Sequence, residues 1–131
     1  MSAPKKEVVV TDKTPMPFNP MPFSAAVKSN GMVYCSGNIG MDPITLKVVE
    51  GSVKDRTRQI MRNLSGVLED AGSSLQNIVK ANVYLTSMEN FKAMNEAYLE
   101  FFTDYVPART CVEVKGLPLG TDVEIECTAH L

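Results

Sequence analysis

The spacing of apolar residues changes along the chain, and each change predicts a different element. Over residues 53–71 the apolar side chains recur every three or four positions, which is typical of an amphipathic helix. Ser52 can cap the start of this helix, and Gly72 can end it. A second stripe with helical spacing, over residues 91–102, predicts another helix that begins after Ser87. Each helix therefore has one apolar face that needs a surface to pack on.

Shorter apolar segments predict the strands of that surface. Residues 25–29 and 32–35 flank Asn30 and Gly31, the dipeptide most typical of a two-residue hairpin turn. Residues 78–85 are rich in β-branched side chains and predict a strand that is buried on at least one side. These segments lie before and between the two predicted helices.

The last two predicted strands, residues 109–115 and 122–130, both alternate apolar and polar side chains. We expect them to form an antiparallel pair, because aligning Val112 with Ile125 gathers the apolar side chains on one face. The other face then holds one arginine, one cysteine and three carboxylates: Arg109, Cys111, Glu113, Glu124 and Glu126. We expect either water or a neighbouring subunit to cover it.

The same register places Glu124 beside Glu113. Two close carboxylates disfavour double ionisation, so one of them is expected to have a raised pKa. A carboxyl group that titrates closer to neutrality is a better proton shuttle than an ordinary one.

The order of elements is strand, strand, helix, strand, helix, strand, strand. It predicts an α+β fold, a two-layer sandwich in which a mixed sheet carries two helices on one face. A chain of 131 residues with 44% hydrophobic content is long enough for one domain with a buried core. Prolines are frequent near the start, so we divide the chain into an extended segment, 1–22, and a single domain, 23–131, with 8–10 as a candidate edge strand.

Charge and hydropathy exclude several kinds of partner. The net charge is −2 and the pI is about 5.4, so no chain-wide field favours nucleic acid or an anionic membrane. Arginines 56, 58 and 62 on the 53–71 helix have acidic neighbours, which favours a solvated face over an RNA-binding stripe. No apolar run approaches the ~18–20 residues of a membrane span. We expect neither nucleic acid nor a membrane as a partner.

The cysteines and the single histidine also limit the chemistry. Cys35, Cys111 and Cys127 are too few and too widely spaced for a disulfide framework, and His130 adjoins the C-terminus. We expect no metal site and reduced, intracellular thiols. The first fifteen residues lack arginine, which argues against a mitochondrial transit peptide. A cytoplasmic location is expected, with the mitochondrial matrix as the alternative.

Arg109 and the Ser36-Gly37 pair are candidates for binding a small ligand. Arg109 follows Pro107 at a strand start, where its guanidinium can hold a planar carboxylate or can simply be solvated. Gly37 lets backbone N–H groups approach a ligand closely, or it marks a plain turn. A thiolate nucleophile at Cys111 would lack a histidine base, which favours an inert, packed thiol.

Three segments in the order Cys35–Gly40, Pro107–Val114 and Val123–Ala129 closely resemble the reactive intermediate deaminase A family, also called the YjgF family. The likeness runs from about Pro22 to Ala129. It implies the chorismate-mutase-like version of the α+β sandwich. It also implies a homotrimer with a ligand pocket in each cleft between subunits.

Members of this family hydrolyse reactive enamines and imines, chiefly 2-aminoacrylate and 2-iminobutanoate, to 2-keto acids and ammonia. The resemblance implies two catalytic residues: Arg109 would hold the substrate carboxylate, and Glu124 would position or activate the attacking water. It implies a substrate pocket built by Phe23, Ser36, Gly37 and the backbone of Cys111. An imine is already electrophilic, so no metal, cofactor or covalent nucleophile is expected.

The chain departs from the family pattern at two positions. Phe23 stands where a tyrosine is common, and Asn38 stands where many members have glutamine. Both changes bear on substrate preference. A non-catalytic trimer that binds 2-keto acids or acts as a chaperone is the alternative function. A ribonuclease or translation inhibitor ranks third, because the chain offers no catalytic histidine pair.

Overall fold

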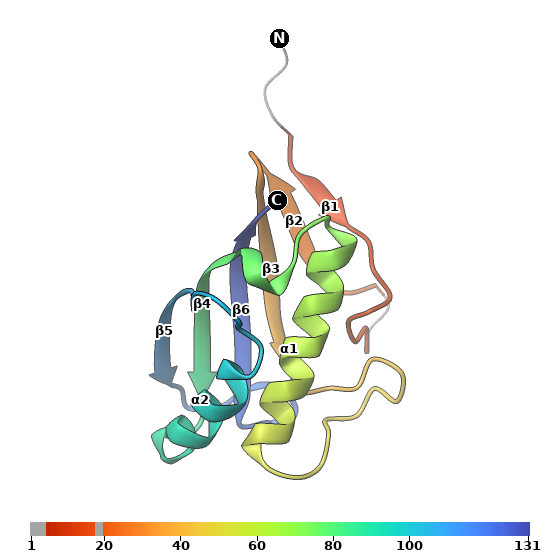
Figure 1. The fold of residues 1–131 in the computed structure, drawn as a ribbon. Coiled ribbons are helices and arrows are strands. Elements are labelled where there is room, and N and C mark those ends of the chain that lie inside the picture. Colours follow the sequence, from red (N-terminus) through yellow and green to blue (C-terminus); the bar gives the residue numbers. More distant parts are fainter. Residues whose placement is uncertain (1–4, 18–19) are drawn as a thin grey trace.

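A six-stranded mixed sheet forms one layer of the molecule, and two helices pack on one of its faces (Figure 1). The computed structural model describes residues 5–17 and 20–131; residues 1–4 and 18–19 of the predicted extended segment lie outside this description. The strands are β1 (Glu7–Val9), β2 (Ala26–Ser29), β3 (Met32–Ile39), β4 (Ile78–Leu85), β5 (Ala108–Glu113) and β6 (Val123–His130). The helices are α1 (Val53–Asp70) and α2 (Phe91–Leu99), with short 3₁₀ turns η1 (Leu75–Asn77), η2 (Met88–Asn90) and η3 (Pro118–Gly120). This arrangement confirms the predicted α+β sandwich.

Helix α1 forms where the apolar spacing predicted it. The Ser52 hydroxyl accepts a hydrogen bond from the Lys54 N–H, and the Asp55 carboxylate accepts one from the Ser52 N–H at 2.9 Å. This reciprocal cap satisfies two of the otherwise unpaired donors at the helix start. The apolar face of α1 is fully buried against the sheet, and burial of each large aliphatic side chain stabilises the fold by about 1.5–3 kcal/mol.

Helix α2 is shorter than predicted. Ser87 caps η2, with its hydroxyl accepting from the Glu89 N–H, and α2 begins only at Phe91 and ends at Leu99. Met94 and Tyr98 are buried on its inner face. Phe101 and Phe102 follow the end of α2 and still pack against the core. The apolar pattern that predicted a longer helix therefore includes two core residues that are not helical.

The N-terminal half of the sheet follows the predicted hairpin. Asn30 and Gly31 both have positive φ, at 52° and 76°, which the two-residue turn between β2 and β3 requires. β1 pairs antiparallel with β2 and forms an edge of the sheet, which confirms the edge strand expected near residues 8–10. β3 continues to Ile39, beyond its predicted end.

The predicted pairing of the last two strands is wrong. The strand order is β1-β2-β3-β6-β4-β5, so β4 lies between β5 and β6. β6 runs antiparallel to both β3 and β4, whereas β5 pairs with β4 in parallel. The physical reason is the helix between β4 and β5, which returns the chain to the same end of the sheet and allows a parallel neighbour.

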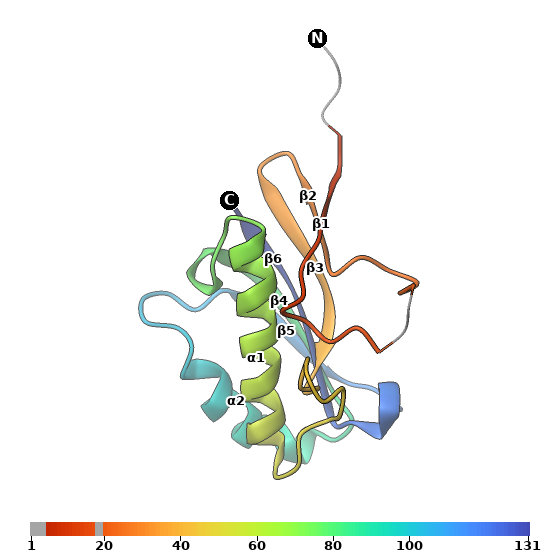
Figure 2. The ribbon, with the colours of Figure 1, turned by 90° about the vertical axis from the view of Figure 1, so that its right-hand side faces the viewer.

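This topology also changes which residues share a face. Ala81 of β4 is buried beneath the helices, and Arg109 is its register partner on β5. Arg109, Cys111 and Glu113 therefore point to the helix-facing side, and the prediction that they share a face with the two glutamates of β6 is wrong. Figure 2 shows the helices on one side of the sheet and the N-terminal loop and η3 on the other, which we call the open face.

Candidate functional site

A pocket of about 500 Å³ lies on the open face, beside the central strand β6. The N-terminal loop and η3 contribute apolar side chains that include Phe23, which is half-exposed, and Leu119. β3 contributes Ser36 and Gly37, and β6 contributes Glu124. The resemblance named these β3 and β6 residues and Phe23 as site residues, and one chain brings them together. We call Phe23, Ser36, Gly37 and Glu124 the pocket half.

An irregularity in β3 shapes the floor of the pocket. The register between β3 and β6 shifts between Cys35 and Asn38, so Ser36 and Gly37 leave the regular ladder. The Ser36 hydroxyl donates to the Ser24 carbonyl at 2.6 Å, which fixes the N-terminal loop against the strand. A Cβ atom on Gly37 would overlap the Glu124 carboxylate. Only glycine therefore lets the backbone of β3 lie directly against this carboxylate.

Asn38 has a structural partner that the sequence did not reveal. Its side chain is buried, and its Oδ1 accepts a hydrogen bond from the Thr14 hydroxyl at 3.0 Å. Thr14 is itself buried, so this bond holds the start of the N-terminal loop to the sheet. Thr14 and Asn38 are 24 positions apart in the sequence, so no local pattern predicts their contact.

Glu124 is the partly buried carboxyl group of the pocket. Burial raises its pKa from the ordinary value, and the neighbouring Glu126 carboxylate raises it further. The expected direction of the shift is confirmed, but its predicted cause is wrong, because Glu113 lies on the opposite face of the sheet. Glu126 in turn accepts a hydrogen bond from the Tyr84 hydroxyl on β4.

Arg109 lies outside this pocket, on the helix-facing side of the edge strand β5. Its guanidinium carbon lies 4.9 Å from the centre of the Tyr98 ring and 5.7 Å from that of Phe91. Its Nη1 lies 3.8 Å from the Met94 sulfur. None of the ion pairs formed within residues 5–17 and 20–131 includes Arg109. Two aromatic faces thus hold a cation that has no carboxylate partner among the described residues.

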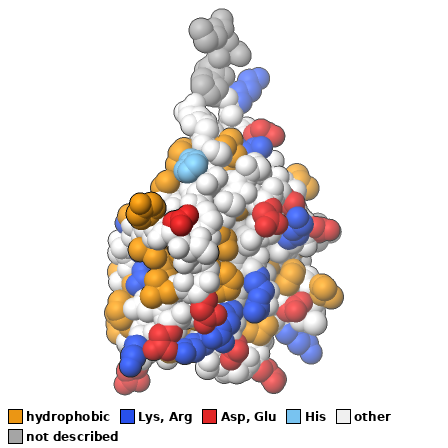
Figure 3. All heavy atoms as spheres, viewed as in Figure 1, with side chains coloured by type: hydrophobic (Ala, Val, Ile, Leu, Met, Phe, Trp, Pro, Cys, Tyr) orange, Lys and Arg blue, Asp and Glu red, His pale blue; other side chains and the backbone are white. Residues whose placement is uncertain are grey.

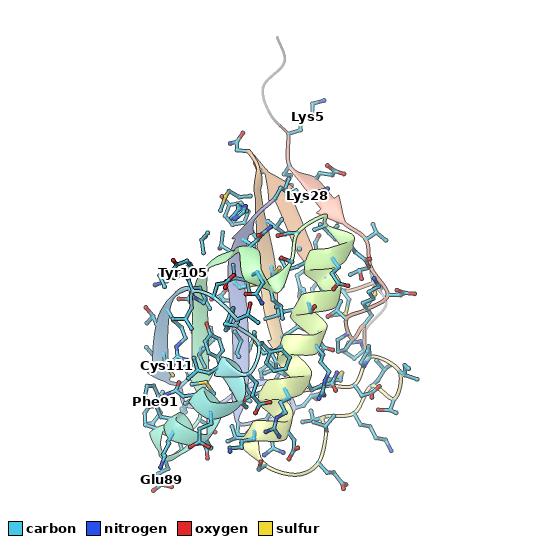
Figure 4. The ribbon with its side chains drawn as sticks, in the orientation of Figure 1. Lys5, Lys28, Glu89, Phe91, Tyr105 and Cys111 are labelled. Carbon is cyan, nitrogen blue, oxygen red and sulfur yellow. The ribbon has the colours of Figure 1, made fainter. Side chains whose placement is uncertain are left out.

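Cys111 lies beside Arg109 on the same side of β5, and Figure 4 shows it next to Phe91 at this edge of the molecule. Burial raises the pKa of its thiol, with the Arg109 charge opposing the shift. A neutral thiol is a poor nucleophile, which favours the packed, inert role. We call Arg109 and Cys111 the arginine half.

Within a single chain, the pocket half and the arginine half lie apart. The pocket half opens on one face of the sheet, the arginine half faces the helices, and β4 separates the strands that carry Glu124 and Arg109. The six predicted site residues therefore form two groups rather than one. Among the described residues that line the pocket, Glu124 and Glu126 are the only ones with an ionisable side chain, so this part of the pocket offers no cation.

Three of the four cations of α1 are paired with carboxylates. Figure 3 shows Lys and Arg side chains mixed with Asp and Glu over the lower part of the helical face. Three of these cations form close ion pairs, Lys54 with Glu96 at 2.6 Å, Arg56 with Asp122 at 2.7 Å and Arg58 with Glu100 at 2.8 Å. Such pairing leaves little free positive charge on this face for a phosphate backbone.

Metal binding and membrane insertion each need features that the described part of the chain, residues 5–17 and 20–131, does not provide. No group of three or more histidine, cysteine, aspartate or glutamate side chains there is arranged to hold a metal ion. No helix there combines the length and the apolar character needed to cross a membrane.

Comparison with known proteins places the chain among close relatives. The family model described as endoribonuclease L-PSP matches residues 14–131. A RutC family protein of Pyrococcus horikoshii is 42% identical over 95% of this chain and 98% of its own length. The chloroplastic Reactive Intermediate Deaminase A of Arabidopsis thaliana is 40% identical over 99% of this chain and 68% of its own length.

A solved structure shows the same fold. The crystal structure of E. coli TdcF with bound serine superposes with a TM-score of 0.87 at 29% identity, covering 95% of this chain and 98% of that one. The irregularity in β3, the pocket beside β6 and the strand order of the sheet thus occur in a chain whose relatives are RutC and reactive intermediate deaminase proteins. The chain belongs to the endoribonuclease L-PSP family, which includes the YjgF and RidA proteins.

Proposed function

We propose that this protein hydrolyses reactive enamines and imines, such as 2-aminoacrylate and 2-iminobutanoate, to 2-keto acids and ammonia. The observation that carries the proposal is the Glu124 carboxyl group, with its raised pKa, packed against the Gly37 backbone in an open pocket. The Arabidopsis relative named as a reactive intermediate deaminase adds support. A carboxyl group whose pKa is raised is a stronger proton holder than an ordinary one, and it can both give and accept a proton during the reaction.

The proposed reaction needs one proton shuttle. Protonated Glu124 gives its proton to the imine nitrogen, water adds to C2, and the water proton returns to the carboxylate. The carboxyl then protonates the amine nitrogen as the C–N bond breaks, and the carbinol hydroxyl gives its proton back to Glu124. Atoms and charges balance, since imine and water become keto acid and ammonia, and the protein is regenerated.

We further propose that the active form is a homotrimer in which the arginine half of one copy completes the pocket half of another. The substrate carries a carboxylate, and the ionisable side chains that line the pocket, Glu124 and Glu126, offer it no cation. Arg109 is a cation without a carboxylate partner in the part of the chain that the structure describes, and it lies on an edge strand that can meet a neighbour. Two-pronged hydrogen bonding from its guanidinium would seat the substrate carboxylate.

The assay that tests the activity generates 2-iminobutanoate in place. A threonine dehydratase forms the imine, and the release of 2-oxobutanoate is followed with and without this protein. We expect faster release with the parent chain and little acceleration with Glu124→Gln. Equal release with and without the parent chain would contradict the proposed activity.

A non-catalytic trimer that binds 2-keto acids is the second candidate. The TdcF structure with bound serine supports it, because that relative holds a small carboxylic acid. Saturable binding of 2-oxobutanoate without any acceleration of imine hydrolysis would favour this candidate. The nuclease role suggested by the family description is less favoured, because the pocket offers no cation and the paired α1 cations leave little positive charge to attract a phosphate backbone.

The cytoplasmic location stays a prediction, since the Arabidopsis relative is chloroplastic. The proposed chemistry fits any compartment in which reactive imines form.

A further inference from the structure

A hydrogen-bonded pair of side chains adjoins Glu124 on the open face. Tyr84 of β4 is the register partner of Glu124, yet its hydroxyl donates to Glu126, two residues further along β6. Glu124 and Glu126 point to the same face, and both line the pocket. The Tyr84 ring and the β6 backbone thus hold two carboxyl groups side by side.

We propose that Tyr84 and Glu126 are positioning residues that keep a proton on Glu124, so that Glu124 begins each cycle as the proton donor. The Tyr84 hydroxyl fixes the Glu126 carboxylate, and the fixed negative charge opposes ionisation of Glu124. This inference rests on the proposed function for its use in catalysis. The placement of the proton is a property of the three side chains and can be measured without a substrate.

The surroundings of Glu124 leave Glu126 as the dominant charge. On β3, the uncharged Ile39 is its register partner, and the Gly37 backbone lies against its carboxylate. The parts of η3 and the N-terminal loop that line the pocket add apolar side chains. Partial burial raises the pKa of Glu124, and the neighbouring Glu126 carboxylate raises it further.

The other titratable groups of this face are engaged or distant. Lys80 of β4 lies in register with Thr128, and its Nζ donates to the Thr110 hydroxyl at 3.1 Å. Tyr34 of β3 is also in register with Thr128, four residues along β6 from Glu124. His130 lies at the exposed end of β6.

Tyr84 is suited to act as a permanent donor. Its hydrogen bond to Glu126, with help from burial, raises its pKa to about 12. The hydroxyl therefore stays protonated at neutral pH, and the Tyr84–Glu126 bond persists over the range in which Glu124 titrates. Loss of the hydroxyl would free the Glu126 carboxylate to turn toward solvent, where its effect on Glu124 is screened.

The test is a carboxyl NMR titration of Glu124 in the full chain, assigned with Glu124→Gln. The parent is compared with Tyr84→Phe and Glu126→Gln, and with two matched controls, Tyr34→Phe and Glu69→Gln. Both test variants should lower the Glu124 midpoint by about 0.5–1 pH unit, because removal of a neighbouring negative charge makes ionisation easier. The controls remove a hydroxyl from the same face and a carboxylate from α1, and they should leave the midpoint unchanged.

Kinetics on the same variants separate the two proposals. In Tyr84→Phe and Glu126→Gln, the limb of the kcat–pH profile that reports loss of the Glu124 proton should move to lower pH, with KM little changed. An unchanged Glu124 midpoint in both variants overturns this inference, whether or not the parent hydrolyses imines. If the Glu124 midpoint shifts in both variants but the parent chain does not hydrolyse imines, the proposed function is overturned, whereas the inferred positioning of the Glu124 proton stands.

Discussion

The pocket half and the arginine half occupy different kinds of strand. The pocket half sits on β6, a central strand whose inward side chains are all at most 4% exposed. The arginine half sits on β5, an edge strand with one free side, where even the apolar Val112 is 42% exposed. A central strand can place a carboxyl rigidly beside a folded wall, whereas an edge strand can present its residues to another molecule. The position of each strand in the sheet therefore explains why the pocket half is walled in and the arginine half is accessible to another molecule.

The two halves also differ in charge. The pocket that the pocket half lines carries two carboxyl groups, Glu124 and Glu126, whereas the arginine half holds a cation between aromatic rings. Neither is complete for a substrate that carries both a carboxylate and an imine. Substitutions confined to one half separate what each half contributes.

Glu124→Gln should lower kcat for 2-iminobutanoate hydrolysis by ~10²–10⁴, the usual reach of a single general acid or base. The amide is similar in size and cannot shuttle a proton. Binding of 2-oxobutanoate, followed by calorimetry, should change little because Arg109 still holds its carboxylate. Glu69→Gln on α1 is the control, and an equal, small effect of both changes would remove Glu124 from the chemistry.

Arg109→Ala should lower kcat/KM by roughly 30-fold to several thousand-fold, since losing one partner of a desolvated charge pair costs ~2–5 kcal/mol. Arg109→Lys should restore little, because an ammonium lacks the two-pronged geometry. Circular dichroism should show an intact fold. A variant within threefold of the parent would contradict a role for Arg109 in substrate binding.

Gly37→Ala should act on the pocket half alone. The added methyl group would overlap the Glu124 carboxylate, so the end of this flexible side chain must leave its place in the pocket, and a displaced catalytic group slows the reaction. We expect roughly a tenfold loss of kcat/KM. Gly116→Ala, where the new methyl meets open space, is the matched control. Equal kinetics for the two variants would show that close contact at Gly37 is not needed.

Thr14→Val should have the smallest effect on activity and a clear effect on stability. It removes the buried donor to Asn38 and leaves the amide oxygen unpaired, which costs about 1–3 kcal/mol. Urea unfolding should show the loss as a lower midpoint. The exposed Thr103→Val should leave the midpoint unchanged. An unaltered midpoint for Thr14→Val would mean that the bond does not fasten the loop.

The sequence predicted those features that local spacing controls. The cap at Ser52, the stripe over α1 and the Asn30-Gly31 turn each depend on a few neighbouring residues, and each is present. Alternation within β5 and β6 also identified which residues of one strand share a side. Glu124 and Gly37 came from the family resemblance, and the structure places them in contact.

Long-range features escaped prediction for a physical reason. Alternation does not say which strand is the neighbour, nor which side faces the core, so Arg109 was assigned to the wrong face. The strand–helix–strand order of β4, α2 and β5 was the available signal for a parallel pair. No local signal marks Tyr84 as the partner of Glu126, because the two meet only through the pairing of β4 with β6.

The division of one site between two copies can be tested by mixing two inactive variants. Arg109→Ala and Glu124→Gln chains are unfolded in urea, combined in equal amounts and refolded together, and imine hydrolysis is measured. In a mixed trimer, a Glu124→Gln chain still supplies its arginine half to the intact pocket half of an Arg109→Ala chain. Random assembly should restore about a quarter of the sites.

The control mixture combines Glu124→Gln with Gly37→Ala, which damage the same half, so that no mixed site is intact. Recovery near a quarter of parental activity in the first mixture, with none above the separate variants in the control, is the predicted result. No recovery in the first mixture, from oligomers shown by mass to contain both chains, would contradict a site shared between copies.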